Sequence, residues 1–218
     1  MRTTFINTLM RLAEEDSRVF LVIADLGFSV VEEFERTFPD RFINTGIAEA
    51  NAVSIAAGLA LSGKLPYVYG IAPFITMRAF EQVRVDCAYM KTNVRLVGVG
   101  GGLSYGPAGA THHAVEDIAI MRALPNMTVL APGDPWEAEH LIAQSKEIQG
   151  PVYIRLGKNK EPVVSDTTAN CRIGRANIYC DGTDLSILTA GNTFELGTQV
   201  VRTLSNGYGI KASLANIH

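Results

Sequence analysis

The sequence predicts an α/β fold of three layers, built on a parallel sheet of about six strands with helices on both faces. Short apolar runs rich in β-branched residues alternate along the chain with longer helical patterns. These apolar runs contain few polar residues, which is typical of strands buried on both faces of a parallel sheet. Helices must therefore cover the sheet from both sides.

Each expected strand is a short apolar run. The first, from Val19 to Ala24, has no polar residue, and the others are shorter or are interrupted by polar side chains. The expected strands span residues 19–24, 41–44, 66–69, 94–99, 127–130 and 152–156.

Helical patterns fill the intervals at residues 49–61, 77–89, 115–124 and 135–148, and the N-terminus also begins with an amphipathic pattern. The first of these intervals is apolar almost all round, which predicts a helix that is buried or lies in an interface. The last begins at Pro135, which a first helical turn tolerates, and Asp134 before it is a plausible cap.

A second, smaller unit follows the main sheet. Residues 158–171 are polar and aperiodic, which predicts a linker, and they separate a domain at 1–157 from a unit at 172–218. That unit has expected strands at 184–189 and 209–214 around a helix at 193–204. One βαβ unit is too small to bury a core of its own, so we expect an incomplete domain that stops at His218.

Composition excludes several classes of protein. A net charge of −3 gives no electrostatic argument for nucleic acid or an anionic membrane surface. The three cysteines, Cys87, Cys171 and Cys180, lack zinc spacing and suit a reducing compartment. The N-terminus has no signal-type apolar core, and the most apolar run, 47–61, is too short to span a bilayer. We expect a cytoplasmic protein.

The first candidate for chemistry is Glu49, where a strand gives way to the apolar helix. A carboxylate at a helix start often does no more than complement the helix dipole. Here the helix that follows is apolar almost all round, so Glu49 enters a setting of low dielectric constant. Burial favours the protonated carboxyl, whose proton can then be shared with a ligand.

The second candidate is the glycine-rich loop 100–113, which follows an expected strand and carries His112 and His113, two of the chain's four histidines. Ligands of open α/β sheets bind outside the carboxyl ends of the strands. Residues 102–106 also match the G-x-S-x-G nucleophile elbow of hydrolases around Ser104. Several loop residues separate Ser104 from the next helix, and a triad would need His140 from mid-helix, so a hydrolase is disfavoured. Leu103 replaces the third glycine of the dinucleotide fingerprint.

The third candidate is Arg155, near the end of the last strand of the main sheet. A guanidinium there suits bidentate contact with a phosphate. An arginine that only forms a surface salt bridge is an equally good explanation of this residue.

The order and spacing of these pieces resemble the pyrimidine-binding domain of transketolases and related thiamine-diphosphate enzymes. The resemblance runs from about Arg2 to Arg155 and weakly beyond. Its most specific pieces are residues 24–26, 46–49, 109–112, and 124–129 with 131–132.

The resemblance implies roles toward the cofactor, thiamine diphosphate. Glu49 matches the glutamate that hydrogen-bonds N1′ of the aminopyrimidine and so activates the cofactor as an electron sink for transfer of a two-carbon unit. Phe74 and Arg78 match the lining of the pyrimidine pocket, with an alignment loose by about one residue. Asp25 matches a residue close to the cofactor.

The resemblance also implies roles toward a sugar phosphate. Arg2, Ser29 and Arg155 match positions that bind the substrate, and His112 matches a catalytic histidine beside the reacting hydroxyls. Two positions depart from the family pattern: Ala108 stands where transketolases usually carry an aspartate, and Gly100 aligns with a further substrate histidine. Recognition of the sugar hydroxyls is therefore expected to differ.

The diphosphate half of the cofactor site has no counterpart in this sequence. Family enzymes hold Mg²⁺ with a G-D-G motif and a later asparagine, and the nearest match, 133–135, has no suitably spaced partner. The resemblance therefore implies a split transketolase, in which a separate subunit supplies the metal ligands and self-association is expected. The beta subunit of a 2-oxo acid dehydrogenase, a deoxyxylulose-phosphate-synthase-like enzyme and a non-catalytic assembly module remain alternatives.

Overall fold

The computed structural model describes residues 1–158, 160–167 and 170–218 and contains the expected parallel sheet. All neighbouring strands are parallel, and their spatial order is β2-β1-β3-β4-β6-β5. The six predicted strands are confirmed, with bounds that shift by a residue or two: β1 Val19–Ile23, β2 Phe42–Asn44, β3 Leu65–Ile71, β4 Arg95–Val99, β5 Thr128–Leu130 and β6 Val152–Leu156.

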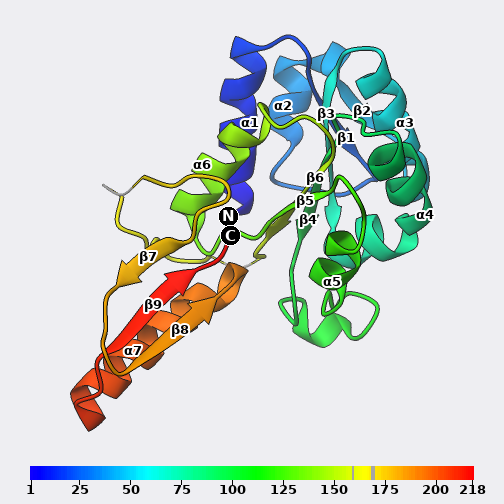
Figure 1. Cartoon of the computed structure of the whole chain (residues 1–218). Helices are drawn as coiled ribbons and strands as arrows, with labels where there is room; N and C mark the ends of the chain where they lie inside the picture. The colour runs from blue at the N-terminus through cyan, green and yellow to red at the C-terminus, as the bar shows by residue number, and fades with distance from the viewer. Residues whose placement is uncertain (159, 168–169) are drawn as a thin grey trace.

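Helices cover both faces of this sheet, as Figure 1 shows. One face packs on α1 (Arg2–Glu15) and α6 (Pro135–Ser145), together with the short α2 (Glu32–Thr37). The other face packs on α3 (Glu49–Leu61), α4 (Phe80–Gln82) and α5 (Asp117–Arg122). Each face has its own buried apolar cluster, so the predicted three-layer fold is confirmed.

The prediction of one regular α-helix at 77–89 is wrong. The segment forms a π-helix, η2 (Phe74–Arg78), then the short α4, then a second π-helix, η3 (Val83–Tyr89). A π-turn places an extra residue in each turn, so the 3.6-residue period assumed from the sequence does not apply there. Short 3₁₀ turns lie at η1 (Pro39–Arg41), η4 (Gly106–Ala108) and η5 (Gly191–Thr193).

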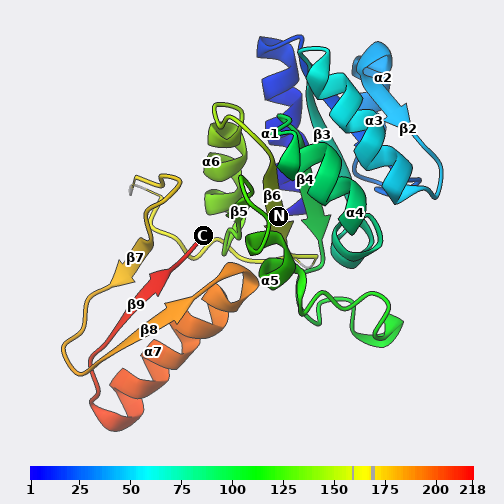
Figure 2. The same ribbon diagram turned by 45° about the vertical axis from the view of Figure 1, so that its right-hand side comes forward.

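The second unit is a three-stranded sheet with one helix, which Figure 2 shows projecting from the main sheet. The expected βαβ unit is confirmed as β8 (Leu185–Thr189), α7 (Phe194–Tyr208) and β9 (Ala212–Asn216). The last strand starts later than expected because Gly209 ends α7 in the left-handed conformation, with φ 68°. The antiparallel β7 (Asn177–Cys180) was not predicted.

The predicted linker, 158–171, includes residues 159, 168 and 169, which lie outside the described residues. Its described residues form no helix or strand. A domain boundary near residue 157 stays a prediction.

A buried acidic pair joins the two sheets. Asp134 caps α6 by accepting a bond from the Glu137 amide, and its other oxygen accepts from the amides of Val164 and Ser165. Glu137 in turn accepts from the side chain of Asn216 in β9 at 2.7 Å. The expected cap is thus confirmed, and both oxygens of the nearest match to a G-D-G aspartate are occupied by backbone amides.

Within the part of the chain that the structure describes, no helix combines the length and the apolar character needed to cross a membrane.

Candidate active site at the carboxyl edge of the sheet

The sheet has a topological switch point beside β1. The chain passes from β1 to β2 on one side and returns to β3 on the other, so the loops after β1 and β3 diverge. Ligands of open parallel sheets bind in the crevice that such a divergence creates. A pocket of about 170 Å³ lies there, lined by residues that include Arg2, Gly27, Tyr69 and Tyr105.

Glu49 is the first residue of α3 and is only 3% exposed. Its carboxylate Oε2 accepts a hydrogen bond of 2.9 Å from the Arg78 guanidinium, which is its one hydrogen-bond partner among the described side chains. The expectation of a buried acid at the start of this helix is met. The opposite face of α3, with Ser54, Gly58 and Leu61, is exposed.

The π-helix η2 carries both other residues expected at the pyrimidine pocket. The Arg78 guanidinium carbon lies 4.2 Å from the centre of the Phe74 ring. Arg78 therefore contacts the ring and the Glu49 carboxylate at once, and its side chain is 52% exposed.

His112 reaches the same group from the glycine-rich loop. Its ring centre lies 5.0 Å from that of Phe74 and 5.5 Å from that of Tyr105. The Thr111 hydroxyl lies 3.0 Å from Nδ1 of His112. His113 instead contacts the backbone oxygen of Gly106, so the structure distinguishes two histidines that the residues alone left equivalent.

Arg2 lines the switch-point pocket with two tyrosines. Burial raises the pKa of Tyr69, and the neighbouring Arg2 opposes that shift. Burial raises the pKa of Tyr105 in the same way. The Lys158 ammonium lies 4.2 Å from the centre of the Tyr105 ring, so two cations face this end of the site.

Asp25 and Ser29 lie in the loop after β1, and both adopt a positive φ, 51° and 62°. Such backbone strain in residues other than glycine is concentrated at functional sites. Asp25 exchanges hydrogen bonds with the Asn44 side chain, which also accepts from the Gly46 amide. Asn44 thereby fixes the loop that leads into α3. Asp25 itself lines a neighbouring pocket, beside Asn44, and does not line the pocket of Arg2.

Arg155 is held inside the protein by an ion pair. Its Nε donates to the buried Asp117 carboxylate at 2.9 Å, and the same oxygen accepts from the Tyr153 hydroxyl at 2.6 Å. The Arg155 side chain is 10% exposed. A Cβ on Gly101 would collide with its guanidinium, so a larger residue there would displace Arg155 from its present position. Arg155 therefore packs against the glycine-rich loop. Its salt bridge with Asp117 is buried and does not lie at the surface.

The structure gives the hydrolase interpretation no support. The Ser104 hydroxyl donates to the Gly101 carbonyl and accepts from Asn192, while His140 bonds to the Trp136 carbonyl within α6. Ser104 is followed by the 3₁₀ turn η4 and further loop, so it does not stand at a strand-to-helix turn.

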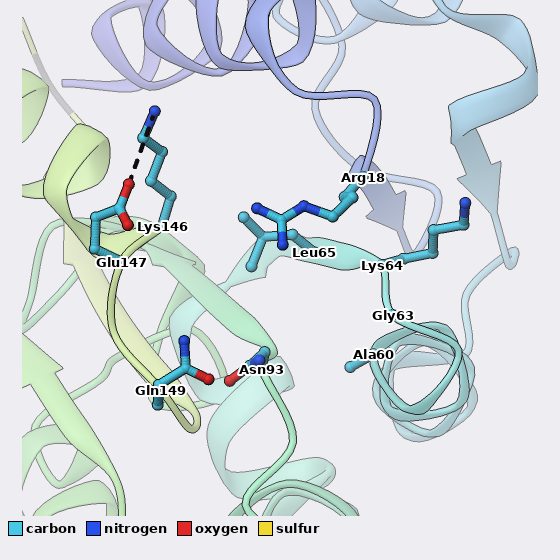
Figure 3. Close-up of a pocket in the computed structure, with 9 residues that line it drawn as sticks. All are labelled: Arg18, Ala60, Gly63, Lys64, Leu65, Asn93, Lys146, Glu147 and Gln149. Carbon is cyan, nitrogen blue, oxygen red and sulfur yellow. Dashed lines mark ion pairs between the residues drawn. The ribbon is translucent and has the colours of Figure 1, made fainter.

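A second pocket, of about 240 Å³, lies at the opposite edge of the sheet, where β1 and β3 begin (Figure 3). Two of its cations are in ion pairs: Arg18 pairs with Asp16, and Lys146 pairs with Glu15 and Glu147. The third, Lys64, lies 5.6 Å from the centre of the Phe20 ring. None of the expected site residues lines it.

Sequence reasoning missed Asn44, Tyr105 and Lys158, and it placed Lys158 in a linker. All three end a strand or lie in the loop beyond one, which is the signal that could have found them. No group of three or more His, Cys, Asp or Glu side chains in the described ranges could hold a metal ion.

The fold and this grouping define an α/β domain of the open parallel-sheet class, with its candidate site at a switch point. A family model described as "Transketolase, pyrimidine binding domain" matches residues 1–162. The chain belongs to the transketolase pyrimidine-binding domain family.

Known proteins of the same kind match over most of the chain. One of the subunits of an apulose-4-phosphate transketolase from Phocaeicola vulgatus is 42% identical over 88% of this chain and 62% of its own length. A putative transketolase C-terminal section of Methanocaldococcus jannaschii is 38% identical over 88% of this chain and 61% of its own. The chain thus spans about three fifths of these relatives. The structure of a split-gene transketolase, an inactive beta4 tetramer, superposes with a TM-score of 0.89 at 34% identity, over 99% of this chain and 70% of the other.

Proposed function

We propose that this chain is the pyrimidine-binding subunit of a split, thiamine-diphosphate-dependent transketolase. The enzyme transfers a two-carbon ketol unit from a ketose phosphate to an aldose phosphate. The observation that carries this proposal is Glu49, a carboxylate 3% exposed at the start of an apolar helix and adjacent, through Arg78, to the Phe74 ring.

These residues fit an aminopyrimidine. A buried carboxylate supplies one strong acceptor for a ring nitrogen, and an aromatic face beside it supplies a stacking surface. When bound, the cofactor supplies an electron sink for cleavage of the bond between the two transferred carbons and the rest of the sugar. Glu49 shares a proton with N1′ of the pyrimidine, and its burial keeps water from competing for that proton.

The remaining residues act on the sugar. His112, held between Phe74 and Tyr105, is placed to exchange a proton with a substrate hydroxyl. Arg2 in the switch-point pocket offers a cation for the phosphate. Ser29 and Arg155 remain proposed substrate-binding residues, with Arg155 acting while paired to Asp117. Asp25 remains a proposed residue of the cofactor site.

A separate subunit completes the site in this proposal. It contributes the diphosphate-binding half and the Mg²⁺ ligands, and the complex works in the cytoplasm. Exposed apolar side chains on and around α3 and η3, such as Ile47, Leu61 and Tyr89, offer surface for this association and for self-association. The transketolase subunits among the relatives favour this assignment over the dehydrogenase beta subunit that the residues alone left open.

A deoxyxylulose-phosphate synthase is the second candidate, because one such enzyme of Desulforudis audaxviator is 34% identical over 97% of this chain. The chain matches only 33% of that enzyme's length, whereas it covers 62% of the apulose-4-phosphate transketolase chain. Product analysis separates the two activities, since the synthase makes a 1-deoxy sugar phosphate.

Reconstitution tests the proposal. The chain mixed with a diphosphate-binding subunit, thiamine diphosphate and Mg²⁺ is expected to transfer ketol units between sugar phosphates, and the chain alone is expected to be inactive. Apulose 4-phosphate is a first donor to try, given the name of the 42% identical relative. A complex that binds the cofactor and transfers no ketol unit from any ketose phosphate would contradict the proposal.

Replacing Arg2 with Met is expected to raise KM for the sugar phosphate by about 10- to 100-fold, the worth of one charge-assisted hydrogen bond. The kcat should change little, because Arg2 contacts the phosphate and not the reacting carbons. Steady-state kinetics of the reconstituted enzyme provide the measurement. Arg11→Met, in the same helix but far from the pocket, is the matched control. An unchanged KM would remove Arg2 from the phosphate site.

A further inference from the structure

The guanidinium of Arg78 contacts both groups that a pyrimidine ring would need, the Glu49 carboxylate and the Phe74 ring. Arg78 donates to Glu49 Oε2 at 2.9 Å, and its guanidinium carbon stands 4.2 Å from the centre of the Phe74 ring. The His112 ring packs against the same phenyl ring, at 62° to its plane. Phe74 is therefore flanked by Arg78 and by His112, and the Glu49 carboxylate is already bonded.

The contacts of Arg78 are those of a flat cation. A guanidinium is planar, stacks on aromatic faces and donates in its own plane to a carboxylate. A protonated aminopyrimidine is also planar and cationic, and it would stack on Phe74 while donating to Glu49. Arg78 occupies the Phe74 ring and Oε2 of Glu49, and the pyrimidine would need that ring and that carboxylate, so the two groups compete.

We propose that Arg78 is a placeholder: it occupies the pyrimidine position in the subunit without cofactor and leaves when the cofactor binds. This inference rests on the proposed function. A buried carboxylate without a partner is costly, so a counter-ion stabilises Glu49 until the ligand arrives. The Arg78 side chain is 52% exposed, so its head group can move into water without crossing the core.

The placeholder makes a definite prediction about affinity. Part of the binding free energy of the cofactor is consumed in breaking the contacts of Arg78, so their removal should tighten binding. A residue that instead held the cofactor would give the opposite sign. The direction of the change therefore distinguishes the two roles of Arg78.

The experiment is calorimetric titration of thiamine diphosphate, with Mg²⁺ present, into the complex of this chain with its diphosphate-binding partner. Arg78→Met is expected to lower the Kd about three- to fivefold, which is the range for a partly exposed ion pair. Arg11→Met removes an exposed Arg–Glu pair, 3.0 Å long, between α1 and α6 and should leave the Kd unchanged. Weaker or unchanged binding by Arg78→Met would overturn the placeholder.

A second measurement needs no cofactor. In the free chain, the ¹⁵N signals of the Arg78 side chain, assigned by their loss in Arg78→Met, should show a guanidinium with restricted rotation and slowed proton exchange. Glu49→Gln should return those signals to the values of a solvated arginine. Signals of a freely rotating Arg78 in the unmodified chain would refute the contact itself. If the unmodified complex binds no thiamine diphosphate while these signals are as expected, the proposed function fails and the arginine contact stands.

Discussion

Glu49→Gln is expected to lower kcat for ketol transfer by about 10²- to 10⁴-fold, the usual range for loss of a positioned proton-transfer group. The amide keeps the size of the carboxyl and can still lie at the start of α3, but it cannot share a proton with N1′. Turnover of the reconstituted complex is the measurement. Cofactor activation depends on this proton, so the effect should fall on kcat and not on KM for the sugar.

The folded state should be little affected by this substitution. Arg78, the partner of Glu49, is half exposed and can be solvated when the carboxylate is removed. The thermal unfolding midpoint of Glu49→Gln should therefore stay close to that of the unmodified chain. Unchanged turnover would refute the catalytic role of Glu49 and, with it, the assignment that rests on this residue.

Arg95→Met is expected to lower the free energy of unfolding by about 3–5 kcal/mol. Arg95 is fully buried in β4, and its guanidinium donates to the carbonyl oxygens that end α6 and follow it, at Ser145, Ile148 and Gly150. Helix ends leave such carbonyls without partners, and methionine cannot supply the donors. Urea unfolding of the free chain is the measurement.

Arg18→Met is the matched control for this prediction. Arg18 directly precedes β1 and pairs with Asp16, but its side chain is 63% exposed. Loss of an exposed pair typically changes stability by about 0–1 kcal/mol. Equal losses for the two variants would show that the buried bonds of Arg95 contribute no more than a surface ion pair.

The sequence predicted those parts of the fold whose burial can be read from a single strand or helix. Strands such as β1 and β3 are apolar on both faces, and that pattern alone predicts a parallel sheet covered by helices. Glu49 could be singled out because a helix that is apolar almost all round is expected to be buried or to lie in an interface, and Glu49 is indeed on its buried side. The cap at Asp134 was predictable from the proline that follows it, and the βαβ unit of β8 and β9 from the alternation of strand and helix patterns.

The grouping of the site residues was harder to predict from the sequence. Glu49, Phe74 and His112 come from three separate loops and helices, and their grouping was implied by resemblance rather than by any spacing in the chain. The π-turns of η2 and η3 were missed because they break the period on which helix prediction depends.

The sequence by itself determined the class of fold, the burial of Glu49 and the loops that could carry chemistry, because periodicity reports which side of each element faces the core. Tertiary structure alone decided the strand order, the different contacts of His112 and His113, and the direct contact of Arg78 with Glu49 and Phe74. Those features depend on distances between residues far apart in the chain. Such distances are set only when the whole sheet and its helices pack together.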